Sequence, residues 1–136
     1  MSEVKMLSRD DILKARDIKR ELVDMAPFDW GGSVYVKGMS GLDRGQFEVD
    51  MNLTKGPNQS ENWKRFRARM LVACVVGEDD QPLFREQDVD ALNEKSAAAL
   101  DHLTDIAQRL SGFRRQDVDE ITKNSQGGQS EGSITA

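Results

Sequence analysis

Apolar side chains recur at helical spacing near the C-terminal end of the chain, at Leu100, Leu103, Ile106, Ala107 and Leu110. This periodicity places the side chains along one face of a helix. Ser96 precedes the stripe and is a residue type that commonly caps a helix N-terminus. Such a face normally packs against another element. The pattern therefore predicts an amphipathic helix that begins after Ser96.

A second apolar stripe consists of Trp63, Phe66, Met70 and Cys74. Its spacing predicts a helix that Ser60 caps and that runs through Val76. Gly77 and then Pro82 are the usual residues at a helix end. We assign the stripe to the core.

Four basic residues alternate with this second stripe, at Lys64, Arg65, Arg67 and Arg69. Charged residues beside an apolar stripe usually form the solvated face of a helix. A partner with an acidic surface is the alternative. Nucleic acid is not expected, because the net charge is −5 and the isoelectric point is about 4.9, whereas binding to phosphates depends on an excess of Lys and Arg.

A short helix is predicted near the N-terminus. Ser8 followed by Asp11 resembles a capping box, with aspartate in place of the usual glutamate. The helix is expected from Arg9 to Arg16, with Ile12 and Leu13 turned inward.

Two runs of strand-forming residues follow, at 19–25 and 33–37. The segment 26–32 between them contains Pro27, Gly31 and Gly32, which favour a turn. The pattern predicts a β-hairpin at about residues 19–37.

Residues 42–53 carry two conflicting signals. Phe47, Val49, Met51 and Leu53 alternate with polar residues, which indicates a half-buried strand. The pair Ser40 and Asp43 resembles a helix cap, and the spacing of Leu42, Val49 and Leu53 fits a helix. We favour the helix and keep the strand as the alternative.

Acidic residues crowd the start of a further predicted helix, at Glu86, Asp88 and Asp90, where they complement the helix dipole. Arg85 stands where a Ser, Thr or Asp cap is more usual, so this helix could begin differently. Residues 124–136 have no apolar periodicity and are rich in Gly, Ser and Gln, which predicts a disordered tail. The fold class is α+β, with one mainly helical domain over residues 1–123 and a small hairpin.

The composition bears on the number of domains and on the compartment of the protein. A chain of 136 residues fits one domain. Its single cysteine permits no internal disulfide and suits a reducing compartment such as a cytoplasm. The most apolar run, 70–76, is too short to span a membrane, and the N-terminus lacks the apolar segment of a signal peptide.

Residues suited to catalysis or metal binding are scarce. His102 is the only histidine, with a solvent-facing or locally hydrogen-bonded position expected, and Cys74 has no basic neighbour within a helical turn. The acids at 78–90 do not have the spacing of a calcium loop, and no phosphate-binding or nucleophile motif occurs. We expect no catalytic residue, cofactor or metal, and a protein that is not an enzyme.

Three segments carry a resemblance to a known family: GMSG (38–41), GEDDQPLF (77–84) and EKSAAAL (94–100). In this order and spacing they resemble the tail assembly chaperones of long-tailed bacteriophages and prophages. The resemblance covers roughly residues 7–124. It implies a host-cytoplasmic chaperone that binds the tape-measure protein and assists tail-tube assembly, with the tail-tube protein as a second partner and self-association as an option.

The same resemblance implies a longer product made by ribosomal frameshifting near the end of the reading frame. A structural tail or head–tail connector subunit is the alternative function. Candidate partner contacts are the apolar residues of predicted turns, with burial over the core as the competing interpretation: Phe28, Trp30, Leu83, Phe84 and Phe113.

Overall fold

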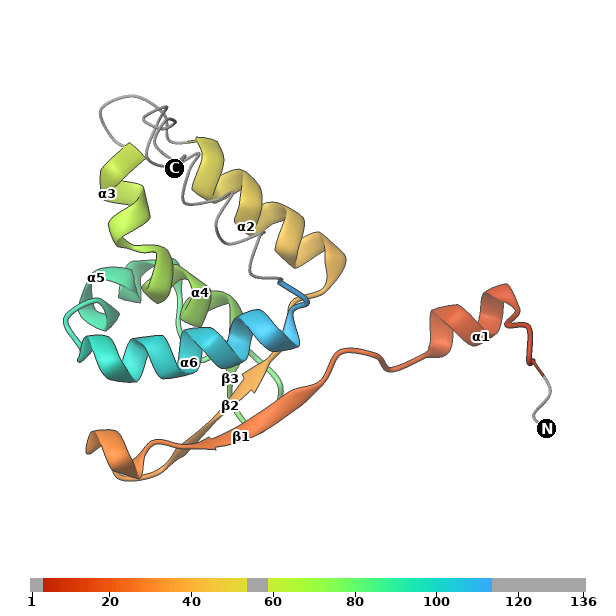
Figure 1. The fold of residues 1–136 in the computed structure, drawn as a ribbon, viewed down its shortest axis with the longest axis horizontal. Helices are drawn as coiled ribbons and strands as arrows, with labels where there is room; N and C mark the ends of the chain where they lie inside the picture. Colours follow the sequence, from red (N-terminus) through yellow and green to blue (C-terminus); the bar gives the residue numbers. More distant parts are fainter. Residues whose placement is uncertain (1–3, 54–58, 114–136) are drawn as a thin grey trace, which may run out of the picture.

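The computed structural model describes residues 4–53 and 59–113. Within them, a layer of helices lies against one face of a small antiparallel sheet, and the N-terminal helix stands apart (Figure 1). The α+β class with mainly helical content is confirmed. Residues 124–136, where we expect a disordered tail, lie outside the described residues.

The predicted hairpin is present. Strand β1 (Arg20–Asp24) pairs antiparallel with β2 (Ser33–Lys37), and a short 3-10 turn, η1 (Ala26–Phe28), forms the tip. A third strand that the sequence pattern did not reveal, β3 (Val75–Val76), pairs with the other edge of β2. The strand order is β1-β2-β3, so β1 lies at the sheet edge.

The conflict over residues 42–53 is resolved in favour of a helix, α2 (Gly41–Leu53). The Ser40 hydroxyl accepts a hydrogen bond from the Asp43 amide at 3.0 Å, as the cap predicts. Phe47 and Met51 face the core from this helix, whereas Val49 is 47% exposed. The alternation of apolar residues therefore reflects two faces of a helix.

The single helix predicted up to Val76 is wrong. The segment instead forms α3 (Gln59–Lys64) and α4 (Phe66–Cys74), and its last two residues form β3. The break falls at Arg65, whose ψ of 10° departs from helical geometry. Val75 and Val76 leave the helix because their backbone groups pair with β2.

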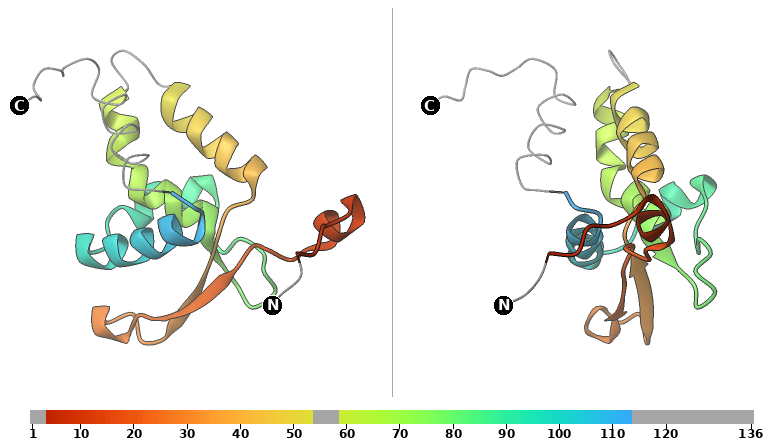
Figure 2. Two further views of the ribbon diagram at one scale, coloured as in Figure 1. Left: turned by 45° about the vertical axis from the view of Figure 1, so that its right-hand side comes forward. Right: turned by 90° about the vertical axis from the view of Figure 1, so that its right-hand side faces the viewer.

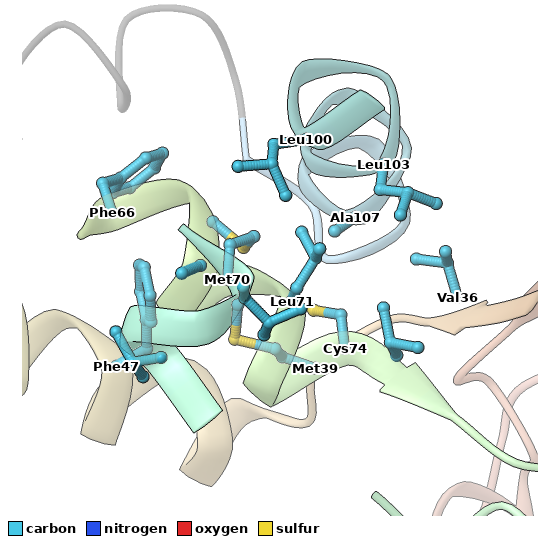
Figure 3. Close-up of a cluster of buried hydrophobic side chains, with 14 of the residues drawn as sticks. Val36, Met39, Phe47, Phe66, Met70, Leu71, Cys74, Leu100, Leu103 and Ala107 are labelled. Atoms are coloured by element: carbon cyan, nitrogen blue, oxygen red, sulfur yellow. The ribbon is translucent and has the colours of Figure 1, made fainter. Parts of the chain in front are cut away.

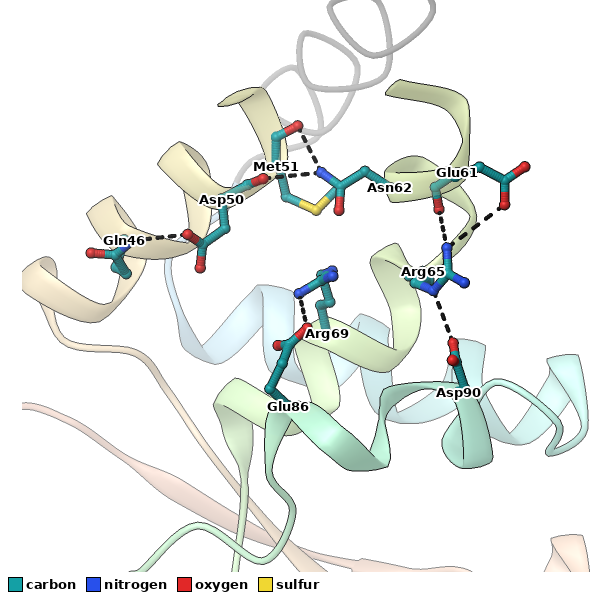
Figure 4. Close-up of polar contacts among 9 residues, drawn as sticks. All are labelled: Gln46, Asp50, Met51, Glu61, Asn62, Arg65, Arg69, Glu86 and Asp90. Atoms are coloured by element: carbon teal, nitrogen blue, oxygen red, sulfur yellow. Dashed lines mark hydrogen bonds and ion pairs between the residues drawn. The ribbon is translucent and has the colours of Figure 1, made fainter. Parts of the chain in front are cut away.

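Buried Asn62 fixes α3 against the end of α2 (Figure 4). Its side-chain amide donates to the carbonyls of Asp50 and Met51 at 3.0 and 3.1 Å. Carbonyls in the last turn of a helix have no partner within the helix, so the amide satisfies two of them.

The chain after β3 returns to the helical layer. A 3-10 turn, η3 (Glu86–Asp88), leads into the short helix α5 (Val89–Leu92). Helix α6 (Ala97–Leu110) follows, and the Ser96 hydroxyl accepts from the Ala99 amide at 3.0 Å, which confirms the predicted start.

The core lies where α4 crosses α6 above the inner face of the sheet (Figure 3). Met70 and Leu71 of α4 and Leu103 of α6 are completely buried. Val36 of β2 is also completely buried and contributes to the cluster from the sheet. Both predicted stripes supply this core, with Trp63, Ile106 and Leu110 half-buried at its edge.

The GMSG segment packs closely against the end of α6. A β-carbon built on Gly38 would lie 2.4 Å from the carbonyl oxygen of Leu110, closer than atoms can approach. The neighbouring Met39 amide donates to the Ser111 hydroxyl at 3.0 Å. The end of the hairpin and the end of α6 are thereby joined, and only glycine fits at position 38.

The N-terminal helix α1 (Arg9–Lys14) differs from the prediction. Its capping box is present, with Ser8 and Asp11 exchanging hydrogen bonds of 3.0 and 3.1 Å. The expected inward orientation of Ile12 and Leu13 is wrong, because these side chains are 56% and 65% exposed. Helix α1 stands away from the rest of the molecule on an extended connector (Figures 1 and 2).

Candidate partner-binding surface

The basic residues along α3 and α4 are paired with acids at the surface, as Figure 4 shows for Arg65 and Arg69. Lys64 and Arg67 are exposed, as a solvated face predicts, whereas Arg65 and Arg69 are half-buried. The Arg65 guanidinium donates to Asp90 of α5 at 2.9 Å and to the carbonyl oxygen of Glu61 at 3.0 Å. The hydrogen bond and charge of Asp90 raise the pKa of Arg65 above its ordinary value. Lys64 pairs with the Glu61 carboxylate at 3.1 Å.

The other two arginines connect α4 to the elements that pack beside it. Arg69 bonds to Glu86 of η3, and Arg67 bonds to Asp101 of α6. The acids at the start of the 86–92 segment therefore neutralise arginines at α4 and also complement the dipole of their own helix. A basic cluster that is already neutralised is poorly suited to bind phosphates.

The two candidate reactive side chains, Cys74 and His102, lie in different environments. Cys74 is completely buried, with its Sγ 3.8 Å from the Ser111 hydroxyl, and burial raises the pKa of its thiol to about 11. A thiol of this kind remains protonated and is a poor nucleophile at neutral pH. The exposed His102 ring lies 5.3 Å from the Phe28 ring, between centroids.

Metal ligands and membrane-spanning helices were the remaining candidates among the described residues. In residues 4–53 and 59–113, no three His, Cys, Asp or Glu side chains are placed to hold a metal ion. Across the same two ranges, every helix is too short or too polar to cross a membrane.

The outer face of the sheet carries a row of apolar residues. The strand register places Leu22, Tyr35 and Val76 directly opposite one another, and Val76 is bridged to Pro82. Residues opposite one another point to the same side of a sheet, and the core-facing Val36 belongs to the other side. Leu22 is 60% exposed, and Leu83, which follows Pro82, is 52% exposed.

Charged residues border this row. The Arg20 guanidinium lies 4.0 Å from the centre of the Tyr35 ring and donates to Asp80 at 2.8 Å. Lys37 also donates to Asp80, at 3.4 Å. These bonds hold the 77–83 loop beside the strands. We call this side the outer sheet face: exposed Leu22 and Pro82 with half-buried Tyr35. Leu83 points to the other side, because its amide donates to the Val75 carbonyl oxygen at 3.1 Å and places it opposite Val75.

The five predicted contact residues are distributed over three places. Leu83 is exposed at the end of the 77–83 loop, and Phe84 beside it is half-buried against the core. Phe28 and Trp30, at the hairpin tip, are also half-buried. Phe113 is buried at the far end of α6 and packs against the Phe47 ring at 6.2 Å, between centroids.

A larger exposed surface was missed at the N-terminus. Every residue from Val4 to Arg20 is exposed, and the segment contains large apolar side chains at Val4, Met6, Leu7, Ile12, Leu13 and Ile18. We call residues 4–19 the N-terminal arm. The shortness of its helix was the available signal, because fewer than two turns bury little against a core.

The comparisons with known proteins concern the fold. No family model matches the sequence, and no curated protein matches it. The structure is similar to the solved tail assembly chaperone of bacteriophage HK97, with a TM-score of 0.53 and 15% sequence identity. The likeness covers 74% of this chain and 94% of that chain. The two chains share a fold. The family resemblance drawn from the three sequence segments is confirmed at this level.

Proposed function

We propose that this protein is a bacteriophage tail assembly chaperone of the host cytoplasm, which binds the tape-measure protein and assists assembly of the tail tube. The fold shared with the HK97 chaperone supports a role in tail assembly. The observation that carries the binding role is the exposure of apolar side chains at the outer sheet face and in the N-terminal arm.

The physical basis is the balance between apolar contacts and charge. An amphipathic helix binds a partner by placing its apolar side chains against an apolar surface. Exposed Leu83 offers such a surface beside the half-buried Phe84, and exposed Leu22 offers another on the opposite side of the sheet. The net charge of −5 keeps a molecule with exposed apolar residues in solution.

The hairpin tip is a second candidate contact. Phe28 and Trp30 are half-buried, so each retains surface that a partner can cover. Large aromatic residues dominate the energetics of many interfaces. Phe113 is left out of the proposed surface, because it is buried against Phe47 and Arg44.

Co-purification with the tape-measure protein tests the proposal. In cells that co-express both proteins, Leu83→Asp and Trp30→Ala should each reduce recovery of the tape-measure protein. Val49→Asp is the matched control, since Val49 on α2 is 47% exposed and lies outside the proposed surface. Equal recovery with all three variants would contradict this assignment, provided that circular dichroism melts show folded proteins.

The composition of purified virions separates the chaperone from a structural subunit. A chaperone leaves the particle, so mass spectrometry of virions should detect the tube and tape-measure proteins without this chain. Its presence in stoichiometric amounts would instead support a tail or head–tail connector subunit. A tail-tube gene upstream and a tape-measure gene downstream would agree with the chaperone.

The frameshift implied by the resemblance falls outside the described residues. Thr122-Lys123-Asn124 can be encoded with the slippery heptamer A-AAA-AAC, and Gln126-Gly127-Gly128 can contain a run of guanines. Sequencing the gene is the test. If neither site contains a slippery heptamer and no overlapping frame opens downstream, the two-product mechanism is wrong for this protein. A single-product chaperone would remain tenable.

A further inference from the structure

The two edges of the sheet differ in how their backbone groups are bonded. After β3 the chain folds back along its own strand. The Leu83 amide donates to the Val75 carbonyl oxygen at 3.1 Å. The Gly77 amide donates to the Gln81 carbonyl oxygen at 3.0 Å. The edge at β3 is thus closed by the protein's own chain, whereas β1 is the last strand at the other edge.

Bonds at the two ends of β1 fix which of its backbone groups point away from β2. The Lys19 carbonyl oxygen accepts from the Gly38 amide at 3.0 Å. At the other end, the Met25 amide donates to the Gly32 carbonyl oxygen at 2.8 Å. Bonded and non-bonded residues alternate along an antiparallel strand, so the odd-numbered residues of β1 bond to β2. The remaining three residues present their amides and carbonyls to the edge: Arg20, Leu22 and Asp24.

These edge groups are accessible to another chain. Within residues 4–53 and 59–113, no hydrogen bond reaches the backbone of these three residues. The chain before Lys19 leads away from the body and does not fold over the edge (Figures 1 and 2). A row of unpaired amides and carbonyls is the feature by which a sheet accepts a further strand.

The side chains of β1 define what a further strand must carry. Leu22 is 60% exposed beside Tyr35 on the outer sheet face. Asp24 is exposed and forms no ion pair within the part of the chain that the structure describes. Arg20 is already bound to Asp80 at 2.8 Å. Side chains directly opposite one another on paired strands contact each other, so an apolar residue suits Leu22 and a basic residue suits Asp24.

We propose that the edge of β1 binds an extended segment of a partner protein as an added antiparallel strand. The segment has an apolar residue opposite Leu22 and a lysine or arginine two residues earlier, opposite Asp24. The apolar residue exchanges both backbone hydrogen bonds with Leu22. The antiparallel direction follows the sheet, in which β1, β2 and β3 all pair in this way.

A synthetic peptide and the full chain test this inference. The peptide contains Lys-Thr-Val within flanking Thr and Gln residues, so that Val can lie opposite Leu22 and Lys opposite Asp24. Titration into isotope-labelled protein, followed by NMR, should give saturable shifts of the amide resonances of residues 20–24. Hydrogen exchange of the Leu22 amide should become slower, because this amide gains an acceptor.

Methylation of the peptide shows whether backbone pairing is responsible, and it requires no change in the protein. N-methylation at Val removes the donor that faces Leu22 and should abolish the shifts. N-methylation at the next Thr, whose amide points away from the edge, should leave them unchanged.

Two protein variants make the same comparison from the other side. Leu22→Pro removes an amide that does not bond to β2, a position where strands tolerate proline, and should abolish binding. Leu22→Thr keeps the amide and should weaken binding only in part. Circular dichroism melts check that both variants are folded.

A charge exchange tests the register. Wild type should bind the Lys peptide more tightly than a matched peptide with Glu in its place. Asp24→Lys should reverse this order. Asp43→Lys on α2 makes the same change at another exposed residue and should leave the order as in wild type.

The contradicting results are specific. The inference is wrong if wild type shows no saturable shift, if the peptide methylated at Val binds as well as the unmodified one, or if the shifts fall outside β1. Shifts of residues 20–24 that depend on protein concentration without peptide would assign the edge to a second copy of the chain instead. The assay contains no tape-measure protein, so its outcome is independent of the proposed function.

Discussion

Helices α1 and α6 begin in the same way and end up in opposite environments. Each is preceded by a serine whose hydroxyl accepts from the amide three residues later, Ser8 from Asp11 at 3.1 Å and Ser96 from Ala99 at 3.0 Å. Leu103 of α6 is completely buried, whereas Leu13 of α1 is 65% exposed. Local capping therefore defines a helix without deciding whether its apolar residues are buried within the same chain.

Length and neighbours account for the difference. Helix α6 has 14 residues, which is enough for its apolar stripe to run along α4. Helix α1 has six residues and is joined to the sheet by a connector that leads away from it. Burial within the chain requires both a long apolar face and a connection that returns it to the core.

The largest difference in the free energy of unfolding is expected between the variants Leu103→Ala and Leu13→Ala. Removal of a completely buried leucine should lower the free energy of unfolding by about 2 to 5 kcal/mol. The same truncation at exposed Leu13 should change it by less than about 0.5 kcal/mol. Denaturant titrations measure both. Similar losses at the two sites would mean that the arm contributes to the stability of its own body.

The buried thiol of Cys74 should give the body a dependence on alkaline pH. Burial raises the pKa of Cys74 from 9.0 to about 11, so the unfolded chain loses this proton at lower pH than the native chain. The resulting stability is complete below pH 9 and is lost as the pH rises to 11, at about 1.4 kcal/mol per unit of pKa difference.

The measurement is the free energy of unfolding of wild type and Cys74→Ala between pH 8 and pH 11. The wild type should lose about 2 to 3 kcal/mol more than the variant over this range. Parallel curves would show that the thiol ionises equally well in the native protein.

Gly38→Ala tests the junction of the hairpin with α6. The added methyl group would lie 2.4 Å from the Leu110 carbonyl oxygen, so the backbone must shift. A cost of about 1 to 3 kcal/mol is typical of such overpacking. Gly41→Ala is the matched control, because a β-carbon there meets no atom within 4 Å. A thermal melt that leaves Gly38→Ala unchanged would show that the two segments separate freely.

The smallest expected effect compares the two serine caps. Ser96→Ala should lower the free energy of unfolding by about 1 kcal/mol, because the Ala99 amide loses its acceptor. Ser8→Ala should leave global unfolding unchanged and alter only the backbone chemical shifts of residues 9–14. A comparable global loss from Ser8→Ala would indicate that α1 unfolds together with the core.

The sequence predicted the elements whose signals are local. Capping residues and apolar spacing predicted α6, and turn residues predicted the hairpin. Capping residues and apolar spacing also predicted α2 despite its alternating pattern. The break at Arg65 and strand β3 depend on distant partners, Asp90 and β2, and were missed for this reason.

The candidate surface was harder to predict than the fold. Exposed Leu83 was identified from its place in a turn, whereas Leu22 is recognisable as an outward-facing residue only once the strand register is known. The exposure of Ile12 was missed because an amphipathic pattern does not reveal which molecule covers it.

The direct passage of α4 into β3 bears on how the protein is made. The pairing of β1 with β2 closes a short loop, whereas the pairing of Val36 with Val75 must wait until α2, α3 and α4 have been synthesised. On the ribosome, the second edge of β2 is therefore open while these helices emerge. Open strand edges attract other chains. The two residues of β3 thus protect the nascent protein, since their arrival closes that edge.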